Sequence, residues 1–520
     1  MNFLFLLSFL LLSPYVRAAP RDERVDDELE NLYFEYGTPV GPERGSRVLG
    51  GAETCNDEFR INNRNIPAEF IRLAYHDSAT HNKFDGTGGL DGSIRFRAEL
   101  DRPENVGAVG MFTTFLRSHS GVNQLVSWAD VIAFNVVAVV AGCDGPLIPF
   151  RGGRVDATVP GPPGVPEPHQ SLESHTESFR RQGFNKEEMI GLVACGHTLG
   201  GVRSLDFPDH VAPSPDNDQD NIHLFDTTHT FDNAVVTEYL SGNTQNPLVN
   251  HPNTTMLSDL RIFSSDGNKT MQRLANPNHF QRTCGNLLER MINTVPRGVK
   301  LRPPVKPIPI KAGDALLEVT ATTRILRTSM RFLKANPNRK VTLHWHDTAN
   351  RPNSFSALPT NVTTNVTPLA SRHGMTPTRY WFEAPIGLTS VSKYWFTYDE
   401  LDGRGPRKFD NKGKGFLIEQ DELLFAPTLS GGFPRKLVVG LHSNLLPSAV
   451  TGTIFDFNNE ATTPTQGAPL TFQRDTSIPD AAGYSFYSAS FSSAHGATFD
   501  VQALVNGKAI KAEFLRVSYI

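Results

Sequence analysis

The sequence has 520 residues, of which 39% are hydrophobic, and a formal net charge of −4 at pH 7. This length predicts two or three domains rather than one. The nearly balanced charge argues against a nucleic-acid-binding surface, and no stretch after the N-terminus approaches the ~18 apolar residues of a membrane span.

The N-terminus has the pattern of a secretory signal peptide. An apolar run from Phe3 to Leu12 precedes Val16 and Ala18, which suit a cleavage site, although the usual basic residues at the start are missing. We therefore predict a signal peptide at residues 1–18 and a secreted, extracellular protein. Four N-x-T glycosylation sequons agree with export, each of them a weak signal by itself: Asn253, Asn268, Asn361 and Asn365.

Residues 19–50 are rich in charge, RDERVDDELENLYFEYG in part, and are predicted to form an irregular N-terminal extension on the surface. From Glu53 to about Pro296 the pattern is helical. Within it, the nearly continuous apolar run 126–143 predicts a buried helix, and the proline- and glycine-rich segment 152–168 predicts a loop.

The first candidate site residues lie in the segment FIRLAYHDSATHNKFDGTGGLDGSI, residues 70–94. Pro67 suits a first helical turn, and Arg72 and His76, four residues apart, would share one helix face. A base beside a fixed cation can take a proton from a bound acid and stabilise the anion that remains. The alternative is an ordinary helix with one exposed Arg–His pair.

Four potential oxygen donors follow among glycine turns, in a pattern that suits a hard cation such as calcium: Asp77, Gly89, Asp91 and Ser93. A polar loop without a cation is the alternative. Further on, GLVACGHTLGGV, residues 191–202, reads as an apolar helix with His197 in its interior. Such a histidine is commonly a satisfied core residue, but it can also be the axial ligand of a haem.

Taken together, RLAYHD, GGLDGSI and ACGHTLG resemble motifs of the plant, fungal and bacterial haem peroxidase superfamily, with features of both cytochrome c peroxidase and the secreted fungal enzymes. The resemblance extends from about Cys55 to Val295. It implies a mostly α domain at residues 51–296 that binds haem b, with His197 as the axial iron ligand. Hydrogen peroxide and a small organic electron donor would be the substrates, and the reaction would pass through a ferryl intermediate.

The resemblance also assigns roles to individual residues. His76 would move a proton between the two peroxide oxygens, and Arg72 would stabilise the departing charge. Asn105 would accept the other ring N–H of His76, and Asp259, in TTMLSDLRIF, would accept that of His197. Helix capping is the alternative role for Asn105 and for Asp259.

Secreted relatives hold two calcium ions, and the set that begins at Asp77 resembles the distal site. The proximal site would take Thr198 together with oxygen donors from FDTTHTFDN: Asp226, Thr228, Thr230 through its carbonyl, and Asp232. The spacing is one residue tighter than in relatives, so a potassium site or a plain turn is the alternative.

The chain has four cysteines, which in a secreted protein suggests two disulfides in one of three connectivities. Related fungal peroxidases tie the segment before the distal helix to the end of the next long helix. That resemblance favours Cys55–Cys143 and leaves Cys195–Cys284. Two buried free thiols are the alternative.

Several positions depart from the family pattern. Tyr75 replaces an aromatic residue that is usually Trp or Phe, and it is either a spacer or an oxidisable residue; it also removes the tryptophan that the catalase-active branch crosslinks. Phe225 stands where cytochrome c peroxidase keeps a radical tryptophan, which argues against cytochrome c as the donor.

Specialised donor sites are also incomplete. Some relatives bind manganese through three carboxylates, whose positions here are Asn65, Glu69 and Arg203. Only Glu69 is acidic, and the positive charge of Arg203 would repel Mn(II). Leu192 occupies the position of a surface tryptophan in lignin-oxidising relatives. Small, phenolic donors that react at the exposed haem edge are therefore expected.

The proline-rich segment 297–313 is predicted to be a stiff extended linker. After it, polar and apolar residues alternate between turn signals, which predicts an all-β region. Its length fits one large β-sandwich or two immunoglobulin-like domains, for which we expect bounds of 314–426 and 427–520.

The β region contains Trp345, Trp381 and Trp395, which could stack on the sugar rings of a cell-wall polysaccharide or fill the sandwich cores. An alternative function follows from this region. The peroxidase part could be a catalytically vestigial scaffold, with the β domains acting as a carbohydrate-binding or adhesion module. The intact set of Arg72, His76, His197 and Asp259 argues against this alternative.

Overall fold

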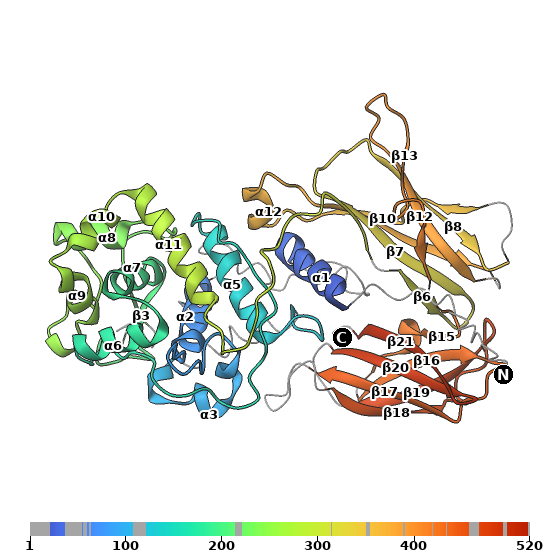
Figure 1. The fold of residues 1–520 in the computed structure, drawn as a ribbon, viewed down its shortest axis with the longest axis horizontal. Helices are drawn as coiled ribbons and strands as arrows, with labels where there is room; N and C mark the ends of the chain where they lie inside the picture. Colours follow the sequence, from blue (N-terminus) through green and yellow to red (C-terminus); the bar gives the residue numbers. More distant parts are fainter. Residues whose placement is uncertain are drawn as a thin grey trace, which may run out of the picture.

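The computed structural model places a helical part and a large β region side by side (Figure 1). The predicted signal peptide, 1–18, lies outside the residues that the structure describes. These are residues 21–36, 55, 60–61, 64–107, 121–213, 221–313, 315–349, 354–387, 390–418, 420–432, 434–456, 467–491 and 497–517.

The helical part confirms the predicted mostly α domain. Its main helix is α5, Trp128–Gly142, which is buried along nearly its whole length, as the apolar run predicts. Ser127 caps this helix by accepting a hydrogen bond from the amide of Asp130. The helices around it are α2 Ile66–Ala79, α3 Arg97–Leu100, α6 Leu172–Gln182, α7 Lys186–Gly196, α8 Ala234–Ser241, α9 Ser258–Phe263, α10 Lys269–Leu274 and α11 Pro277–Ile292. Short strand pairs join them: β1 Arg60–Ile61 with β2 Arg64–Asn65, and β3 Gly201–Arg203 with β4 Ile222–Leu224.

One helix is shorter than predicted. The segment 191–202 does not continue as a helix, because α7 ends at Gly196 and His197 is its C-terminal cap residue. The chain then turns at Gly200, where φ is +82°, and enters β3. The four glycines in the segment weaken a helix. Gly200 adopts a left-handed conformation that other residues disfavour.

Both disulfides have the pairing that the resemblance implies. Cys55 is bonded to Cys143, at the end of α5, and Cys195 of α7 to Cys284 of α11. No cysteine is left free. Among the described residues, no helix is both long enough and apolar enough to cross a membrane.

The β region is built from antiparallel strands, apart from the parallel pair of β6 with β15. The longer sheet runs in the order β10-β11-β7-β6-β15-β16-β19-β18-β17-β20-β21, with β5 also paired to β7. The smaller sheet runs β13-β12-β8-β9, with β14 also paired to β12. The strands are β5 Ile310–Ala312, β6 Leu316–Val319, β7 Arg324–Phe332, β8 Lys340–Asp347, β9 Phe355–Ala357, β10 Asn361–Thr364, β11 Thr378–Ile386, β12 Val391–Asp399, β13 Arg407–Phe409, β14 Phe416–Leu417, β15 Leu423–Phe425, β16 Arg435–His442, β17 Ala449–Asp456, β18 Ala468–Arg474, β19 Tyr484–Phe491, β20 Ala497–Val505 and β21 Lys508–Val517, and one short helix, α12, spans Pro368–Arg372.

This region has two hydrophobic cores that share strands. On β16, Val438 faces one core whereas Leu437 and Val439 face the other, as the two-residue period of a strand requires. The all-β prediction is therefore confirmed. The division near residue 427 falls between β15 and β16, which pair directly, and it remains a prediction, as does the likeness to immunoglobulin domains.

The predicted irregular N-terminal extension is wrong for residues 21–36. They form helix α1, Arg21–Glu35, which lies between the helical part and the β region (Figure 1). Val25, Leu29 and Leu32 recur at helical spacing, but the many acidic residues between them suggested solvent exposure. Those acidic residues are instead neutralised by arginines and a lysine of the β region, which sequence proximity could not indicate.

The predicted linker extends along the helical part before the chain enters β5. The amide of Arg302 donates to the carbonyl of Gly152 at 2.9 Å, and the amide of Val305 donates to that of Phe150 at 2.8 Å. The linker residues therefore contact the loop that follows α5.

Candidate active site

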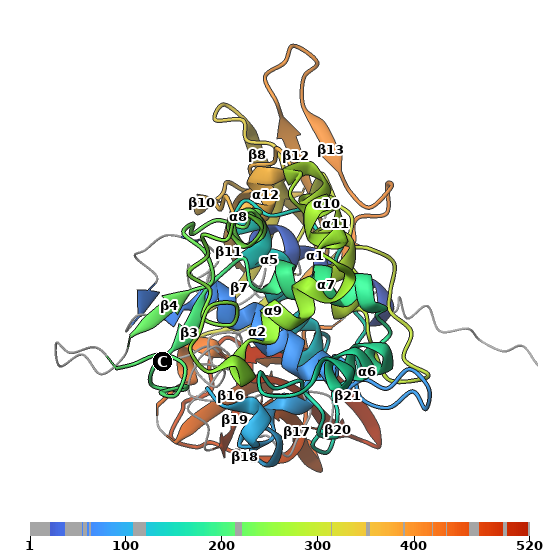
Figure 2. The same cartoon turned by 90° about the vertical axis from the view of Figure 1, so that its left-hand side faces the viewer.

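A cavity of about 450 Å³ lies in the helical part, and the predicted site residues Arg72, His76 and His197 all line it. The cavity is bounded by α2, α7 and α9, which lie close together in the centre of that part (Figure 2). Most of the remaining wall is apolar, with Ile71, Leu199 and Phe225 among the lining side chains.

His76 is oriented by a chain of two hydrogen bonds. Its helix, α2, starts at Asn65, whose side chain accepts the amide of Ala68, and His76 lies in the last turn. The Nδ2 of Asn105 donates to the backbone carbonyl of Glu99 at 2.7 Å, so the amide oxygen must face His76. The Nδ1–H of His76 donates to that oxygen at 2.7 Å, which leaves Nε2 as a proton acceptor.

The surroundings keep His76 neutral. Burial and the positive charge of Arg72 lower its pKa to about 3, and the bond to Asn105 offsets this only in part. A buried neutral imidazole with a free Nε2 is a suitable general base for a bound acid.

Arg72 lies beside His76 as a partly buried cation. Its Nη2 donates to the carbonyl of Val106. Burial lowers the pKa of Arg72, whereas the carboxylates of Asp206 and Glu69 raise it. A side chain at position 107 would come within 2.5 Å of Nη1 of Arg72, so Gly107 leaves the room that the guanidinium needs.

His197 is held by a carboxylate. Its Nδ1–H donates to Oδ2 of Asp259 at 2.8 Å, and Asp259 is almost fully buried. The same oxygen accepts a hydrogen bond from Nδ2 of Asn246 at 2.8 Å. The ring of His197 stacks on Phe225, with centroids 4.3 Å apart and an interplanar angle of 12°. Nε2 of His197 is thus the nitrogen available for a metal ion.

Sequence reasoning missed three of these neighbours. Asn246 has no motif around it. Asp206 lies in a loop and Glu99 in the one-turn helix α3, and the position of both depends on the whole fold. The role of Tyr75, as a spacer or as an oxidisable residue, stays a prediction. Its ring stacks on Phe179 at 6.0 Å and lies beside His76, and burial raises its pKa well above the ordinary range.

The distal cation set is brought together in the structure. The carboxylate of Asp77 accepts hydrogen bonds from the amides of Gly92 and Ile94, at 2.8 and 3.0 Å. That of Asp91 accepts the amide of Ser93 at 3.1 Å. The amide of the fourth member, Gly89, donates to Thr80 Oγ1 at 3.0 Å.

A third carboxylate, Glu99, lies at the same place, where it accepts the Ser93 hydroxyl at 3.3 Å. Burial raises the pKa of Asp77, of Asp91 and of Glu99, the last to about 7. These carboxyl groups therefore lack a sufficient positive charge nearby.

The proximal set is also compact. The Thr198 hydroxyl donates to the backbone carbonyl of Asp232 at 2.5 Å, and the Thr228 hydroxyl lies 3.2 Å from both Asp226 and Asp232. The Thr230 hydroxyl donates to Oδ2 of Asp232 at 2.8 Å, and the Thr230 carbonyl accepts the amide of Asp232 at 3.0 Å. Oδ2 of Asp226 is buried without a hydrogen-bond partner, and burial raises the pKa of this residue to about 7.

Neither set contains a complete acidic or histidine cage. Among the described residues, no group of three or more His, Cys, Asp or Glu side chains is arranged to hold a metal ion. Calcium at these places remains a prediction.

The cavity suits a haem. Its mostly apolar wall would accept a flat macrocycle, and Nε2 of His197 is the soft nitrogen donor that haem iron takes. At Gly196 an added Cβ would meet no atom within 4 Å, so the chain leaves open space next to His197. The fold and these paired histidines define a helical haem-binding domain of the peroxidase type.

Comparisons with known proteins agree. The sequence profile of the Peroxidase family matches residues 53–276. A peroxisomal L-ascorbate peroxidase 5 from Arabidopsis thaliana is 32% identical over 199 residues, covering 38% of this chain and 67% of the relative. The chain belongs to the haem peroxidase superfamily, and it follows that haem is its cofactor and that hydrogen peroxide and an electron donor are the substrates of its class.

Two further relatives mark how far the likeness extends. A WSC domain-containing protein from Arthroderma benhamiae is 37% identical over 322 residues, which is 61% of this chain and 43% of that protein. A mitochondrial cytochrome c peroxidase from Yarrowia lipolytica is 34% identical over 134 residues, 25% of this chain and 39% of that protein. This chain thus spans less than half the length of these two relatives.

Proposed function

We propose that this protein is a secreted haem peroxidase that reduces hydrogen peroxide and oxidises small organic donors such as phenols. One observation carries the proposal. Two histidines line the same cavity with Nε2 free, and each is fixed through Nδ1 by a different partner, Asn105 for His76 and Asp259 for His197.

The chain's own groups have separable roles. Bound haem supplies the redox chemistry, with its iron held by His197. Nε2 of His76 accepts the proton of the bound peroxide and passes it to the oxygen that leaves. Arg72 stabilises the negative charge on that oxygen. Asp259 accepts the Nδ1 proton of His197, which makes His197 a more electron-rich ligand.

Small donors are favoured because the specialised donor sites are incomplete. Arg203, at one of the manganese positions, pairs with Asp206 at 3.4 Å, so a cation and not a third carboxylate occupies that position. Without such a site, a donor would have to be small enough to approach the haem directly, so we expect small phenols.

We also propose that calcium binds at the two predicted sites. The buried carboxyl groups of Asp77, Asp91 and Glu99 support the distal site, because a bound cation would supply the charge that they lack. The unpartnered Oδ2 of Asp226 supports the proximal site.

Secretion is supported by the apolar N-terminal run and by the two disulfides. We also propose that the β region binds cell-wall polysaccharide, but only one of its three tryptophans supports this role. Trp345 and Trp381 are buried and could not stack on a sugar ring. Trp395 is partly exposed and stacks on His344, with centroids 5.6 Å apart, and of the three tryptophans it is the one that a sugar could reach.

The decisive experiment is an absorption spectrum of the purified protein before and after one equivalent of hydrogen peroxide. We expect a Soret band that shifts within milliseconds to seconds, and in His76→Leu the same band with a shift that is at least 100-fold slower. The absence of a Soret band even after reconstitution with haem would refute the proposal. The alternative function, a vestigial peroxidase scaffold with an adhesive β region, would then remain. A fast shift in His76→Leu would refute the role of His76.

A further inference from the structure

Helix α1 occupies a groove whose walls come from distant parts of the chain. On the side of the helical part, Leu29 fits against Gly152, where an added Cβ would lie only 2.4 Å from Cδ1 of Leu29. Tyr33 stacks on Phe150 with centroids 6.2 Å apart. This wall therefore packs against the apolar face of the helix.

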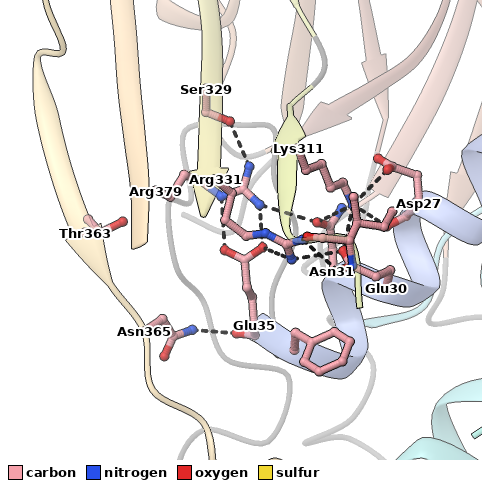
Figure 3. A network of polar contacts seen from close by, with 12 residues as sticks. Asp27, Glu30, Asn31, Glu35, Lys311, Ser329, Arg331, Thr363, Asn365 and Arg379 are labelled. Carbon is pink, nitrogen blue, oxygen red and sulfur yellow. Dashed lines mark hydrogen bonds and ion pairs between the residues drawn. The ribbon is translucent and has the colours of Figure 1, made fainter. Parts of the chain in front are cut away.

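The opposite wall is cationic (Figure 3). The Glu30 carboxylate lies 2.6 Å from Nη2 of Arg331 and 3.1 Å from Nζ of Lys311. Glu35 contacts Arg379 and lies 3.3 Å from Arg331. The side chains of Arg331, Lys311 and Arg379 are at most 4% exposed.

Each of these cations depends on α1 for its counter-charge. Lys311 meets Asp27 at 2.9 Å as well as Glu30, and the carboxylates that the structure gives to Arg331 and Arg379 are Glu30 and Glu35. Without α1, these three positive charges would lie close together without the carboxylates that neutralise them, which is unfavourable. The groove thus has the charge that complements an acidic helix.

The helix also contacts strand β21 of the β region. Oε1 of Glu28 accepts Nδ2 of Asn123, in the helical part, at 2.9 Å and also pairs with Arg516 on β21. Arg24 pairs with Glu513 on the same strand at 3.6 Å. One helix thus contacts the helical part and charged side chains on strands at both ends of the longer sheet.

The helical part and the β region also contact each other directly, because Leu333, Leu369 and Ala370 pack into the hydrophobic core of the helical part. Arg372 at the end of α12 donates to the carbonyls of Ala141 and Gly145, at 3.1 and 2.9 Å. Nε2 of Gln124 donates to Asp500 at 3.0 Å. These direct contacts add to those of α1, which has both an apolar and a charged face between the two parts.

We propose that this groove is a docking site for an acidic amphipathic helix, that residues 21–36 fill it in cis, and that this occupancy holds the helical part and the β region as one rigid body. The inference does not depend on peroxidase activity, because no residue of α1 lines the haem cavity.

The test uses the full chain with Glu30→Gln and Glu35→Gln combined, and Glu23→Gln, an exposed residue of the same helix, as the matched control. In the double variant we expect amide hydrogen exchange across residues 21–36 to become at least tenfold faster and the radius of gyration from small-angle scattering to rise. The control should match the unchanged protein in both measurements.

A labelled synthetic peptide with the sequence of residues 21–36 adds a test in trans. It should bind the double variant, whose groove is open, and not the unchanged protein, whose groove is filled. Unchanged exchange in the double variant would overturn the proposal, and so would faster exchange without any expansion or peptide binding. Should the double variant fail to fold, Glu35→Gln alone is measured in the same way. We then expect faster exchange and a smaller expansion. Unchanged values would again overturn the proposal.

Discussion

The two histidines of the cavity differ in the partner that each Nδ1 meets, and this difference separates their roles. A neutral amide, Asn105, fixes the ring of His76 without adding charge, so the low pKa of about 3 is retained. A carboxylate, Asp259, holds His197 and increases the electron density of its ring. In the proposed function, the same side chain would therefore be a proton acceptor on one side of the cavity and a metal ligand on the other.

At the residue scale, the first prediction concerns Arg72. The positive charge of Arg72 is one cause of the low pKa of His76, so Arg72→Leu should raise that pKa, although burial keeps it below the ordinary value. Because His76 acts in its neutral form, the acid limb of the rate of reaction with peroxide should move to higher pH. The maximal rate should also fall by about 100-fold, since the charge on the leaving oxygen loses its partner.

The measurement is stopped-flow kinetics with peroxide from about pH 3 to pH 8, with Arg97→Leu as the control. Arg97 is exposed and pairs with Asp101, so its replacement should leave both the limb and the rate unchanged. An acid limb that stays in place in Arg72→Leu would contradict the assigned electrostatic coupling.

The same scale shows what the sequence could reveal about the site. Arg72, His76, His197 and Asp259 lie in short motifs with family spacing, and the structure brings them to one cavity. Asp206 and Asn246 could not be predicted, because each acts through a contact whose geometry depends on how loops far apart in sequence fold together.

At the scale of elements, the end of α7 and the start of α9 form one unit. α7 stops at Gly196, so His197 lies at a helix terminus rather than in the helix interior that its apolar surroundings suggested. α9 begins one residue before Asp259, and a single hydrogen bond of 2.8 Å joins the two ends. The orientation of the axial ligand therefore depends on how α9 is placed.

The prediction at this scale is that Asp259→Asn weakens the hold on the cofactor. Loss of the carboxylate should speed haem dissociation by about 10- to 100-fold and raise the reduction potential of the iron, because His197 becomes a weaker donor. Haem transfer to an acceptor protein and a redox titration measure the two effects. Asp266→Asn is the control, because Asp266 bonds Thr270 and does not line the cavity. Equal dissociation rates in both variants would contradict the coupling.

At the scale of the whole molecule, the sequence predicted the domains better than their assembly. Alternating residues predicted strands, but their pairing order, including the parallel contact of β6 with β15, depends on long-range packing. The acidic residues of α1 suggested solvent exposure. Their partners, Lys311, Arg331 and Arg379, lie far away in the sequence, in the β region. Charge patterns along a sequence do not show which charges become buried in pairs.

The last prediction follows from these buried pairs and concerns pH. Around Glu35 stand Arg379 on β11, Arg331 on β7, Lys311 on β5 and the neighbouring carboxylate Glu30. Burial raises the pKa of Glu35, but the three cations outweigh it and hold that pKa below its ordinary value of 4.5. A carboxyl group with a lowered folded-state pKa stabilises the fold above its unfolded-state pKa, and this stabilisation is lost as the pH falls through the lowered value.

We therefore expect the free energy of unfolding to differ between the unchanged protein and Glu35→Gln by a constant amount from about pH 5.5 to pH 8, and the difference to shrink as the pH falls below the ordinary value of 4.5. Urea unfolding at a series of pH values measures this difference, and Glu23→Gln, which removes an exposed carboxylate from the same helix, should show almost none. A difference that grows on acidification would mean that Glu35 is held in its protonated form, and the charged face of α1 would then not be what secures the helix in its groove. A shrinking difference, in contrast, makes the ionised Glu35 part of what joins the catalytic part to the β region at neutral pH.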